Sequence, residues 1–196
     1  MLPLDHLNRA LFRGMAAGYA PEPHLLTLSH WLAVYAIAAV PVTLVLLWWL
    51  RPGTRTTLLS AAASGAAALA ATELISAAIA LPRPFMLHLS PVYLAHAADG
   101  SFPSAHASLM LASAGTLLLT RPTAAWGAGL LALGLATAWA RVYLGLHFPL
   151  DILGSALLSA VTAAAIGREA RGWAGAPARF LGGDWKGRLV PGPGAR

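Results

Sequence analysis

The chain has 196 residues, of which 58% are hydrophobic and only 10% are charged, and its mean hydropathy is +0.66. Because a soluble domain carries about 25% charged residues, this composition excludes a soluble protein and indicates an integral membrane protein. The net charge is +6, and the basic residues lie mainly in loops and a tail, where such residues set membrane topology and contact anionic lipids. We therefore expect no nucleic-acid partner.

The amino-terminal segment comes first, and we assign it residues 1–29. Within residues 3–18, apolar side chains recur at helical spacing, at Leu4, Leu7, Leu11 and Met15. This pattern predicts a short amphipathic helix that lies on the membrane surface.

Five hydrophobic stretches follow, each about as long as the 17 to 25 residues that cross a bilayer. They cover residues 30–50, 57–81, 103–120, 123–140 and 150–167. We therefore predict an all-α integral membrane bundle with about five transmembrane helices and one domain over residues 30–168. The remainder, residues 169–196, is rich in Gly, Pro and Arg, and we expect it to be a flexible basic tail.

The basic residues fall unevenly on the two sides of this bundle. Positively charged loops stay in the cytoplasm, and most of the basic residues lie on the side that receives the C-terminus. These are Arg51, Arg55, Arg121, Arg168, Arg171, Arg179, Lys186, Arg188 and Arg196. We expect a multi-pass protein of the bacterial cytoplasmic membrane whose C-terminus is cytoplasmic and whose opposite face looks outward.

Three short polar blocks lie at the ends of predicted spans on that outward face. The second span ends just before the first block, the third span begins with the second block, and the fourth span returns to the third block. The hairpin path therefore brings together Arg83, Ser104, Ala105, His106, Arg141, His147 and Asp151.

This combination of groups suits phosphate ester cleavage. Arg83 and Arg141 present planar, permanently charged forks that bind phosphate oxygens and stabilise charge during transfer. The Ser104 hydroxyl and the backbone N–H groups from Ser104 through Ala105 to His106, at a predicted helix start, add further donors.

The two histidines and the carboxylate supply the chemistry of transfer. His147 attacks phosphorus if Asp151, four residues on, orients its ring. His106 then protonates the leaving oxygen and later activates water. The scheme needs no metal and no organic cofactor, and the absence of cysteine excludes Cys-ligated metal.

These blocks resemble the type 2 phosphatidic acid phosphatase (PAP2) superfamily, whose pattern is Lys-x6-Arg-Pro, Pro-Ser-Gly-His and Ser-Arg-x5-His-x3-Asp. The chain departs from that pattern at Ser76 for the lysine, Ala105 for the glycine and Ala140 for the serine. Within the superfamily, the sequence around the blocks is similar to bacterial undecaprenyl-diphosphatases.

The resemblance implies that the protein removes the terminal phosphate of undecaprenyl diphosphate through a phosphohistidine and so recycles the lipid carrier of peptidoglycan biosynthesis. A phosphatidylglycerophosphate or phosphatidate phosphatase of the same superfamily is the alternative substrate class. Expected partners are therefore a polyprenyl or glycerophospholipid phosphate and anionic membrane lipids.

A non-enzymatic lipid transporter or scaffold is the alternative from a different class. Its support is Glu73, a carboxylate inside the second predicted span, because a carboxylate in lipid is costly and usually functional. Glu73 and Ser76 are also possible auxiliary groups of the phosphate site. The competing interpretation is a protonated Glu73 bonded to Thr72 or Ser76.

The predicted outer loop contains further titratable side chains, at His88, His96 and Asp99. They either cap the substrate headgroup or are simply solvated. They lack the close, regular spacing of a zinc site.

Overall fold

The structure is a computed structural model that describes the backbone of residues 3–181 and the side chains of residues 4–168. Its elements in chain order are α1 (Pro3–Met15), α2 (Pro23–Val34), η1 (Ala36–Ala38), α3 (Ala39–Leu50), η2 (Pro52–Thr54), α4 (Arg55–Ile79), η3 (Pro84–Leu87), α5 (Ala105–Leu118), α6 (Arg121–Tyr143) and α7 (Pro149–Leu181). All regular elements in the described range are helical, which confirms the all-α class.

The first predicted span is a bent pair of helices rather than one helix over residues 30–50. α2 begins earlier, at Pro23, because the Glu22 carboxylate accepts hydrogen bonds from the backbone N–H groups of His24 and Leu25. α2 and α3 meet at an angle of 41° across the short η1 turn. Pro41 lies in the first turn of α3, where its missing N–H is tolerated but a continuous helix from α2 is not.

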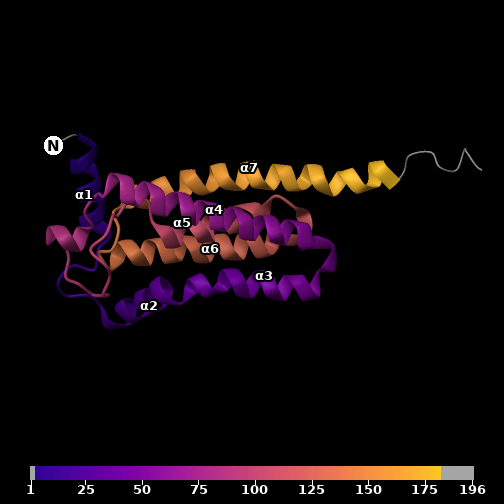
Figure 1. Cartoon of the computed structure of the whole chain (residues 1–196). Coiled ribbons are helices and arrows are strands. Elements are labelled where there is room, and N and C mark those ends of the chain that lie inside the picture. The colour runs from indigo at the N-terminus through magenta and orange to yellow at the C-terminus, as the bar shows by residue number, and fades with distance from the viewer. Residues whose placement is uncertain (1–2, 182–196) are drawn as a thin grey trace, which may run out of the picture.

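Among the described residues, three helical segments are long and apolar enough to cross a membrane: Pro52–Leu87, which contains α4, then α6, and Pro149–Arg168 of α7. The bent pair provides a fourth if it is counted as one span. α5 has 14 residues and so extends only about 21 Å. It forms the centre of the bundle and packs against α4, α6 and α7 (Figure 1).

Small residues let these four helices approach closely. A Cβ added to Gly65 of α4 would lie 2.3 Å from Ser113 Oγ of α5, and one added to Gly127 of α6 would lie 2.8 Å from the backbone nitrogen of Leu118. Hydroxyl groups join the same helices, since Thr72 bonds to Ser108 and Ser159 bonds to the Ser108 carbonyl. Close packing of this kind makes α4 to α7 a firm frame for groups at their ends.

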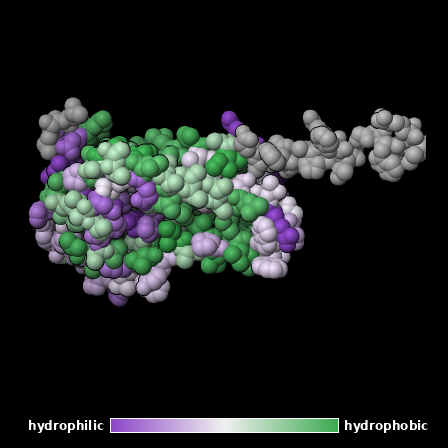
Figure 2. Space-filling model, viewed as in Figure 1, coloured by the Kyte–Doolittle hydropathy of each residue, from purple (hydrophilic) through white to green (hydrophobic). Residues whose placement is uncertain are grey.

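α1 lies across one end of the bundle (Figure 1). Its Leu4, Leu7 and Leu11 are exposed, as expected for a surface helix, whereas Phe12 is fully buried. The visible face of the molecule has a broad hydrophobic band along the bundle and hydrophilic residues gathered at its ends (Figure 2). This distribution fits a bilayer around the bundle with α1 near the polar boundary.

The last helix is longer than expected. The fifth span was predicted to end at residue 167 and a flexible tail to begin at 169, but α7 continues to Leu181. It projects past the ends of α5 and α6 (Figure 1). The rest of the predicted tail, residues 182–196, lies outside the described residues.

Candidate active site

The three polar blocks meet at the end of the bundle where α1 lies. Each comes from a helix end or from the loop beside it. Arg83 precedes η3. Ser104 is the residue before α5, which begins at Ala105 and has His106 in its first turn. Arg141 is in the last turn of α6, His147 is in the loop that follows, and Asp151 is in the first turn of α7. The hairpin path predicted from the sequence therefore brings these residues together.

The loop that bears His147 is fixed by the way α6 ends. Leu146 N–H donates to the Arg141 carbonyl and Gly145 N–H donates to the Val142 carbonyl, which is the Schellman pattern. Gly145 adopts a φ of 77°, and a Cβ there would lie 2.2 Å from Ser90 Oγ, so only glycine fits. The turn places His147 two residues later, inside the bundle end.

The ring of His147 is buried and held in one tautomer. Nδ1 lies 2.8 Å from the Ser101 carbonyl oxygen, and because a carbonyl only accepts, Nδ1 carries the proton. Nε2 lies 3.1 Å from Nη1 of Arg83, and because a guanidinium only donates, Nε2 presents its lone pair. Burial first, and then the charges of Arg141 and Arg83, hold the pKa of His147 well below its usual value. The ring is therefore neutral and its Nε2 is unprotonated, with a lone pair that accepts from Arg83, and an unprotonated nitrogen is what a nucleophile requires.

Asp151 organises the loop more than it contacts the histidine. Its Oδ2 accepts from the Ser101 hydroxyl and, at 2.7 Å, from the Phe148 backbone N–H. The distance from Oδ2 to His147 Nδ1 is 3.5 Å, longer than a good hydrogen bond. The direct orienting bond expected from the sequence is thus replaced by an indirect one, in which Asp151 fixes Ser101 and the Ser101 carbonyl fixes the ring.

Arg83 is buried, and its donors have several partners. Its Nε lies 2.9 Å from Asp99 Oδ1, and Nη2 lies 2.8 Å from the same oxygen and 3.0 Å from the Gly100 carbonyl. Its Nη1 donates to the Leu146 carbonyl at 3.0 Å as well as to His147. The Asp99 carboxylate is the counter-ion that a buried guanidinium needs when no phosphate is bound.

Arg141 is equally buried but has fewer partners. Its Nη1 donates to the Ala33 carbonyl at 3.2 Å, and Nη2 lies 3.1 Å from Nε2 of His96. The His96 Nδ1 lies 3.1 Å from the Ala97 carbonyl, so His96 has the same tautomer as His147. Burial also lowers the pKa of His96. Each arginine therefore faces the Nε2 of a neutral histidine.

The start of α5 supplies more donors. The Ser104 backbone N–H donates to Ser155 Oγ at 2.8 Å, but the Ser104 side chain does not cap the helix. The first N–H groups of α5, from Ala105 onward, have no partners within the helix. His106 is half-buried beside them, and the charges of Arg141 and Arg83 act on its ring.

Two of these polar atoms lack partners. Ser104 Oγ and Arg141 Nε, together with Ser29 Oγ, are the buried side-chain polar atoms without a hydrogen bond in the part of the chain that the structure describes. Buried donors are normally paired. Two unpaired donors in one positively charged site form a place for an anion with oxygen acceptors.

The geometry of these blocks agrees with the family comparison. The PAP2 superfamily profile matches residues 55–168. The chain belongs to the PAP2 superfamily. Its relatives include YbjG of Escherichia coli (strain K12), which is 34% identical over 156 residues, or 79% of this chain and 78% of the relative.

Two further relatives are named undecaprenyl-diphosphatase. The undecaprenyl-diphosphatase BcrC of Bacillus subtilis (strain 168) is 34% identical over 128 residues, or 65% of each chain. The undecaprenyl-diphosphatase of Sulfolobus acidocaldarius is 36% identical over 121 residues, or 61% of this chain and 57% of the relative. A crystal structure of Aquifex aeolicus LpxE has a TM-score of 0.66 at 22% identity and covers 82% of this chain and 94% of that one, so the two share the fold.

The departures from the PAP2 pattern have distinct surroundings. Ser76, in place of the lysine, donates to the Gly100 carbonyl at 2.9 Å, the same carbonyl that accepts from Arg83. Ala140, in place of the serine, is buried in an apolar cluster with Ala33 and Tyr143. In the described structure, no side-chain hydrogen bond joins Ser76 to the unpaired Ser104 Oγ or Arg141 Nε, and the Ala140 side chain has no polar atom.

Glu73 lies on α4 with its side chain exposed. Thr72 and Ser76 bond elsewhere, to Ser108 and Gly100, so the bonds proposed between Glu73 and these hydroxyls are absent. His88 is exposed and fits the solvated alternative.

Sequence reasoning missed Ser101, which contacts both His147 and Asp151. It named His96 and Asp99 only as headgroup caps or solvated side chains, whereas each of them contacts an arginine. A signal for Ser101 was available, because it lies three residues before Ser104. Contacts made by Asp99 and His96 depend on how the loop folds back, which no local pattern reveals.

Proposed function

We propose that the protein is an undecaprenyl-diphosphatase of the cell membrane that forms undecaprenyl phosphate and inorganic phosphate through a phosphohistidine on His147. Membership of the PAP2 superfamily and the names of BcrC and the Sulfolobus relative support this activity. A transporter or scaffold would leave the neutral, oriented His147 without a purpose, so we do not favour it.

The observation that most strongly supports phosphate chemistry is the pair of unpaired donors at Ser104 Oγ and Arg141 Nε. They lie in a site with two buried guanidinium groups, those of Arg83 and Arg141, and among the described residues only the Asp99 carboxylate contacts either of these two. A phosphate would satisfy the free donors and supply the missing negative charge.

The reaction follows from the tautomer of His147. Its Nε2 lone pair attacks the terminal phosphorus, while Arg83, Arg141, Ser104 and the first N–H groups of α5 bind the equatorial oxygens. The bond from phosphorus to the bridging oxygen breaks, and His106 donates a proton to that oxygen, which leaves on undecaprenyl phosphate. The Ser101 carbonyl and nearby Asp151 stabilise the positive charge that forms on the His147 ring.

The second half of the reaction releases phosphate. His106, now a base, takes a proton from water, and the water oxygen attacks the phosphorus of the phosphohistidine. The phosphorus–nitrogen bond breaks, His147 recovers its lone pair, and inorganic phosphate leaves. Ala105, at the start of α5, contributes a backbone N–H and no side-chain chemistry.

The distribution of basic residues supports a site that faces outward, with the C-terminus in the cytoplasm. The exposed leucines of α1 support contact of this helix with the lipid surface beside the site. The basic residues on the cytoplasmic side would contact anionic lipids.

Phosphate release by the purified protein in detergent with excess EDTA tests the proposal. Undecaprenyl diphosphate, phosphatidylglycerophosphate and phosphatidate are compared, with His147→Ala as the control. We expect preference for the diphosphate and no release by the variant. Preference for a glycerophospholipid would keep the mechanism and replace the substrate, and no release from any of them would contradict an enzymatic function.

A further inference from the structure

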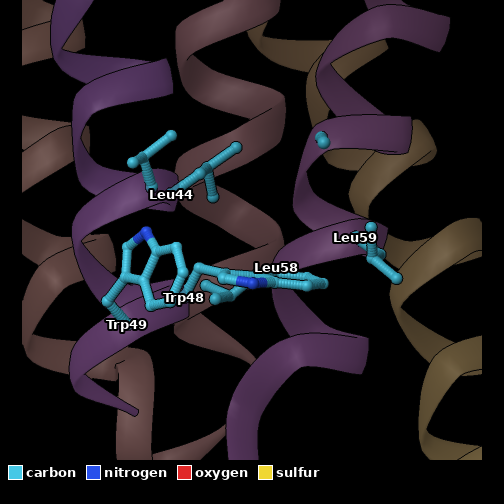
Figure 3. A pocket seen from close by; sticks show the side chains of 7 residues that line it. Leu44, Trp48, Trp49, Leu58 and Leu59 are labelled. Carbon is cyan, nitrogen blue, oxygen red and sulfur yellow. The ribbon is translucent and has the colours of Figure 1, made fainter. Parts of the chain in front are cut away.

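An apolar groove runs between α3 and α4. The part nearer the site, called here its upper part, has a volume of about 440 Å³. It is lined on one side by Ile37, Pro41 and Leu44 and on the other by Ala62, Ala66 and Leu69. Its lower part, of about 250 Å³, continues from Leu44 and Ala62 to Trp48, Trp49, Leu58 and Leu59. Figure 3 shows the side chains of this lower part standing between the two helices. Leu44 and Ala62 line both parts, so the groove is continuous.

The floor of the groove leads to the catalytic histidine. Leu109 and Ser113 of α5 form that floor, and they lie three and seven residues after His106, on the same face of the helix. On α4, Ala62, Ala66 and Leu69 share a face whose next turn contains Glu73. The apolar groove therefore runs along the helix faces that carry His106 on α5 and Glu73 on α4.

We propose that this groove binds the isoprene units of the lipid diphosphate that lie next to the phosphate. This inference rests on the proposed function and specifies which part of the substrate determines affinity. The residues that follow the 41° bend between α2 and α3, from Ile37 to Pro41, line the upper part of the groove. The apolar walls replace the contacts that the prenyl chain makes with lipid, while the diphosphate enters the cluster of arginines and histidines.

The length of the groove limits how much of the chain it holds. From Ile37 to Trp49 it extends along 13 residues, or about 18 Å at 1.5 Å per residue, which accommodates about four extended isoprene units. Undecaprenyl diphosphate has eleven such units, so the remaining units lie in the surrounding lipid. The enzyme should therefore distinguish one unit from four, but not four from eleven.

Ala62 lies at a useful depth in this groove. Ser113 Oγ donates to the Ala61 carbonyl at 3.2 Å, so Ala62 is near the level of Ser113, seven residues or about 10 Å below His106. A chain of one prenyl unit ends above this level. A chain of three or more units passes it.

The test combines substrates of different length with variants that fill the groove from opposite walls. Ala62→Trp fills it from α4 and Leu44→Trp fills it from α3, while Ala160→Trp places the same side chain on exposed α7 as a control. The substrates are dimethylallyl, farnesyl, geranylgeranyl and undecaprenyl diphosphate, with one, three, four and eleven units. The long ones are presented at a fixed surface fraction in mixed micelles.

For the wild type, we expect similar kcat/KM for four and eleven units and a much lower value for one unit. Each groove variant should raise KM for geranylgeranyl and undecaprenyl diphosphate by roughly tenfold, or about 1.4 kcal/mol. The same variants should leave kcat/KM for dimethylallyl diphosphate unchanged, which shows at once that the site is folded. Ala160→Trp should behave as the wild type.

Three results would overturn the inference, and none of them is confused with failure of the proposed function. Unchanged KM for the long substrates in both groove variants would mean that ordinary lipid chains occupy the groove. Loss of activity on every substrate, including the one-unit substrate, would mean that the groove supports the fold instead. A steady rise in kcat/KM from four to eleven units would mean that recognition extends beyond the groove. Failure of the proposed function would instead appear as a wild type without diphosphatase activity.

Discussion

The two arginines of the site lie in contrasting surroundings. Arg83 has a carboxylate partner and two carbonyl partners, whereas Arg141 has one carbonyl, no carboxylate and an unpaired Nε. Each points at a neutral histidine, but His147 is fully buried and His96 is at the rim. The comparison indicates that Arg83 mainly holds neighbouring groups in position, whereas Arg141 has an unpaired donor that is available to a phosphate oxygen.

The largest expected effect separates the two histidines. His147→Asn should abolish phosphate release, by roughly 10³-fold or more, because the nucleophile is lost. His96→Asn should lower kcat/KM by only about threefold to tenfold, since it removes one contact of Arg141. Phosphate release on undecaprenyl diphosphate measures both. Equal losses would mean that His96 takes part in the chemistry and would break the distinction.

The next effect separates the two arginines. Arg141→Lys should lower kcat/KM by about 10²-fold with little change in Tm, because a point charge replaces a fork that binds phosphate. Arg83→Lys should lower both kcat/KM and Tm, because Arg83 also joins Asp99, Gly100 and Leu146. Kinetics and thermal unfolding in detergent measure the pair. A stable Arg83→Lys protein would contradict the structural role of that side.

Replacement of Asp99 should strengthen anion binding, whereas the arginine substitutions weaken it. Its carboxylate occupies the Nε and Nη2 edge of Arg83, where a phosphate oxygen would otherwise bind. Asp99→Asn should therefore tighten inhibition by vanadate or inorganic phosphate by about threefold, through removal of a competing charge. Asp5→Asn, which breaks the distant pair with Arg9, is the matched control. Weaker inhibition in Asp99→Asn would mean that Asp99 is needed to position Arg83.

The smallest effect is on stability against pH. The pKa of His147 is lowered well below its usual value in the folded protein, so between that value and about 6.5 the unfolded chain binds a proton that the folded chain does not. The free energy of unfolding should then fall as the pH drops below 6.5, by up to about 1.4 kcal/mol per pH unit. His147→Asn should lose less stability than the wild type between pH 7 and pH 5.5, by about 2–4 °C in Tm. Parallel curves would contradict a neutral buried His147.

Local patterns in the sequence predicted the helical class and the meeting of the three blocks. Hydrophobic length fixes where a span lies, and alternating direction fixes which ends meet, so Arg83, His106 and His147 could be placed at one end. The same reasoning gave α5 too much length, because hydropathy does not distinguish a helix that crosses lipid from one enclosed by other helices. The bend near Pro41 was likewise invisible to an average over a window.

Several groups that support the site could not be predicted, because they depend on contacts between residues that are distant in sequence. The hydroxyl of Ser101 bonds to Asp151, fifty residues away in sequence, and Arg141 bonds to the Ala33 carbonyl across more than a hundred. Such contacts arise from how loops settle on a packed bundle, which the identity of neighbours in sequence does not encode. The exposure of Glu73 also depends on which face of α4 its neighbours cover.

The position of α1 has a mechanical consequence for the whole enzyme. Phe12 packs edge to face on Phe148 with ring centroids 5.3 Å apart, and the Asn8 side chain accepts from the Leu150 N–H at 3.1 Å. The amphipathic helix α1 thus contacts the residues on either side of Pro149, next to His147. If α1 lies in the headgroup region, we expect its contacts to couple the position of His147 to the surrounding lipid or detergent.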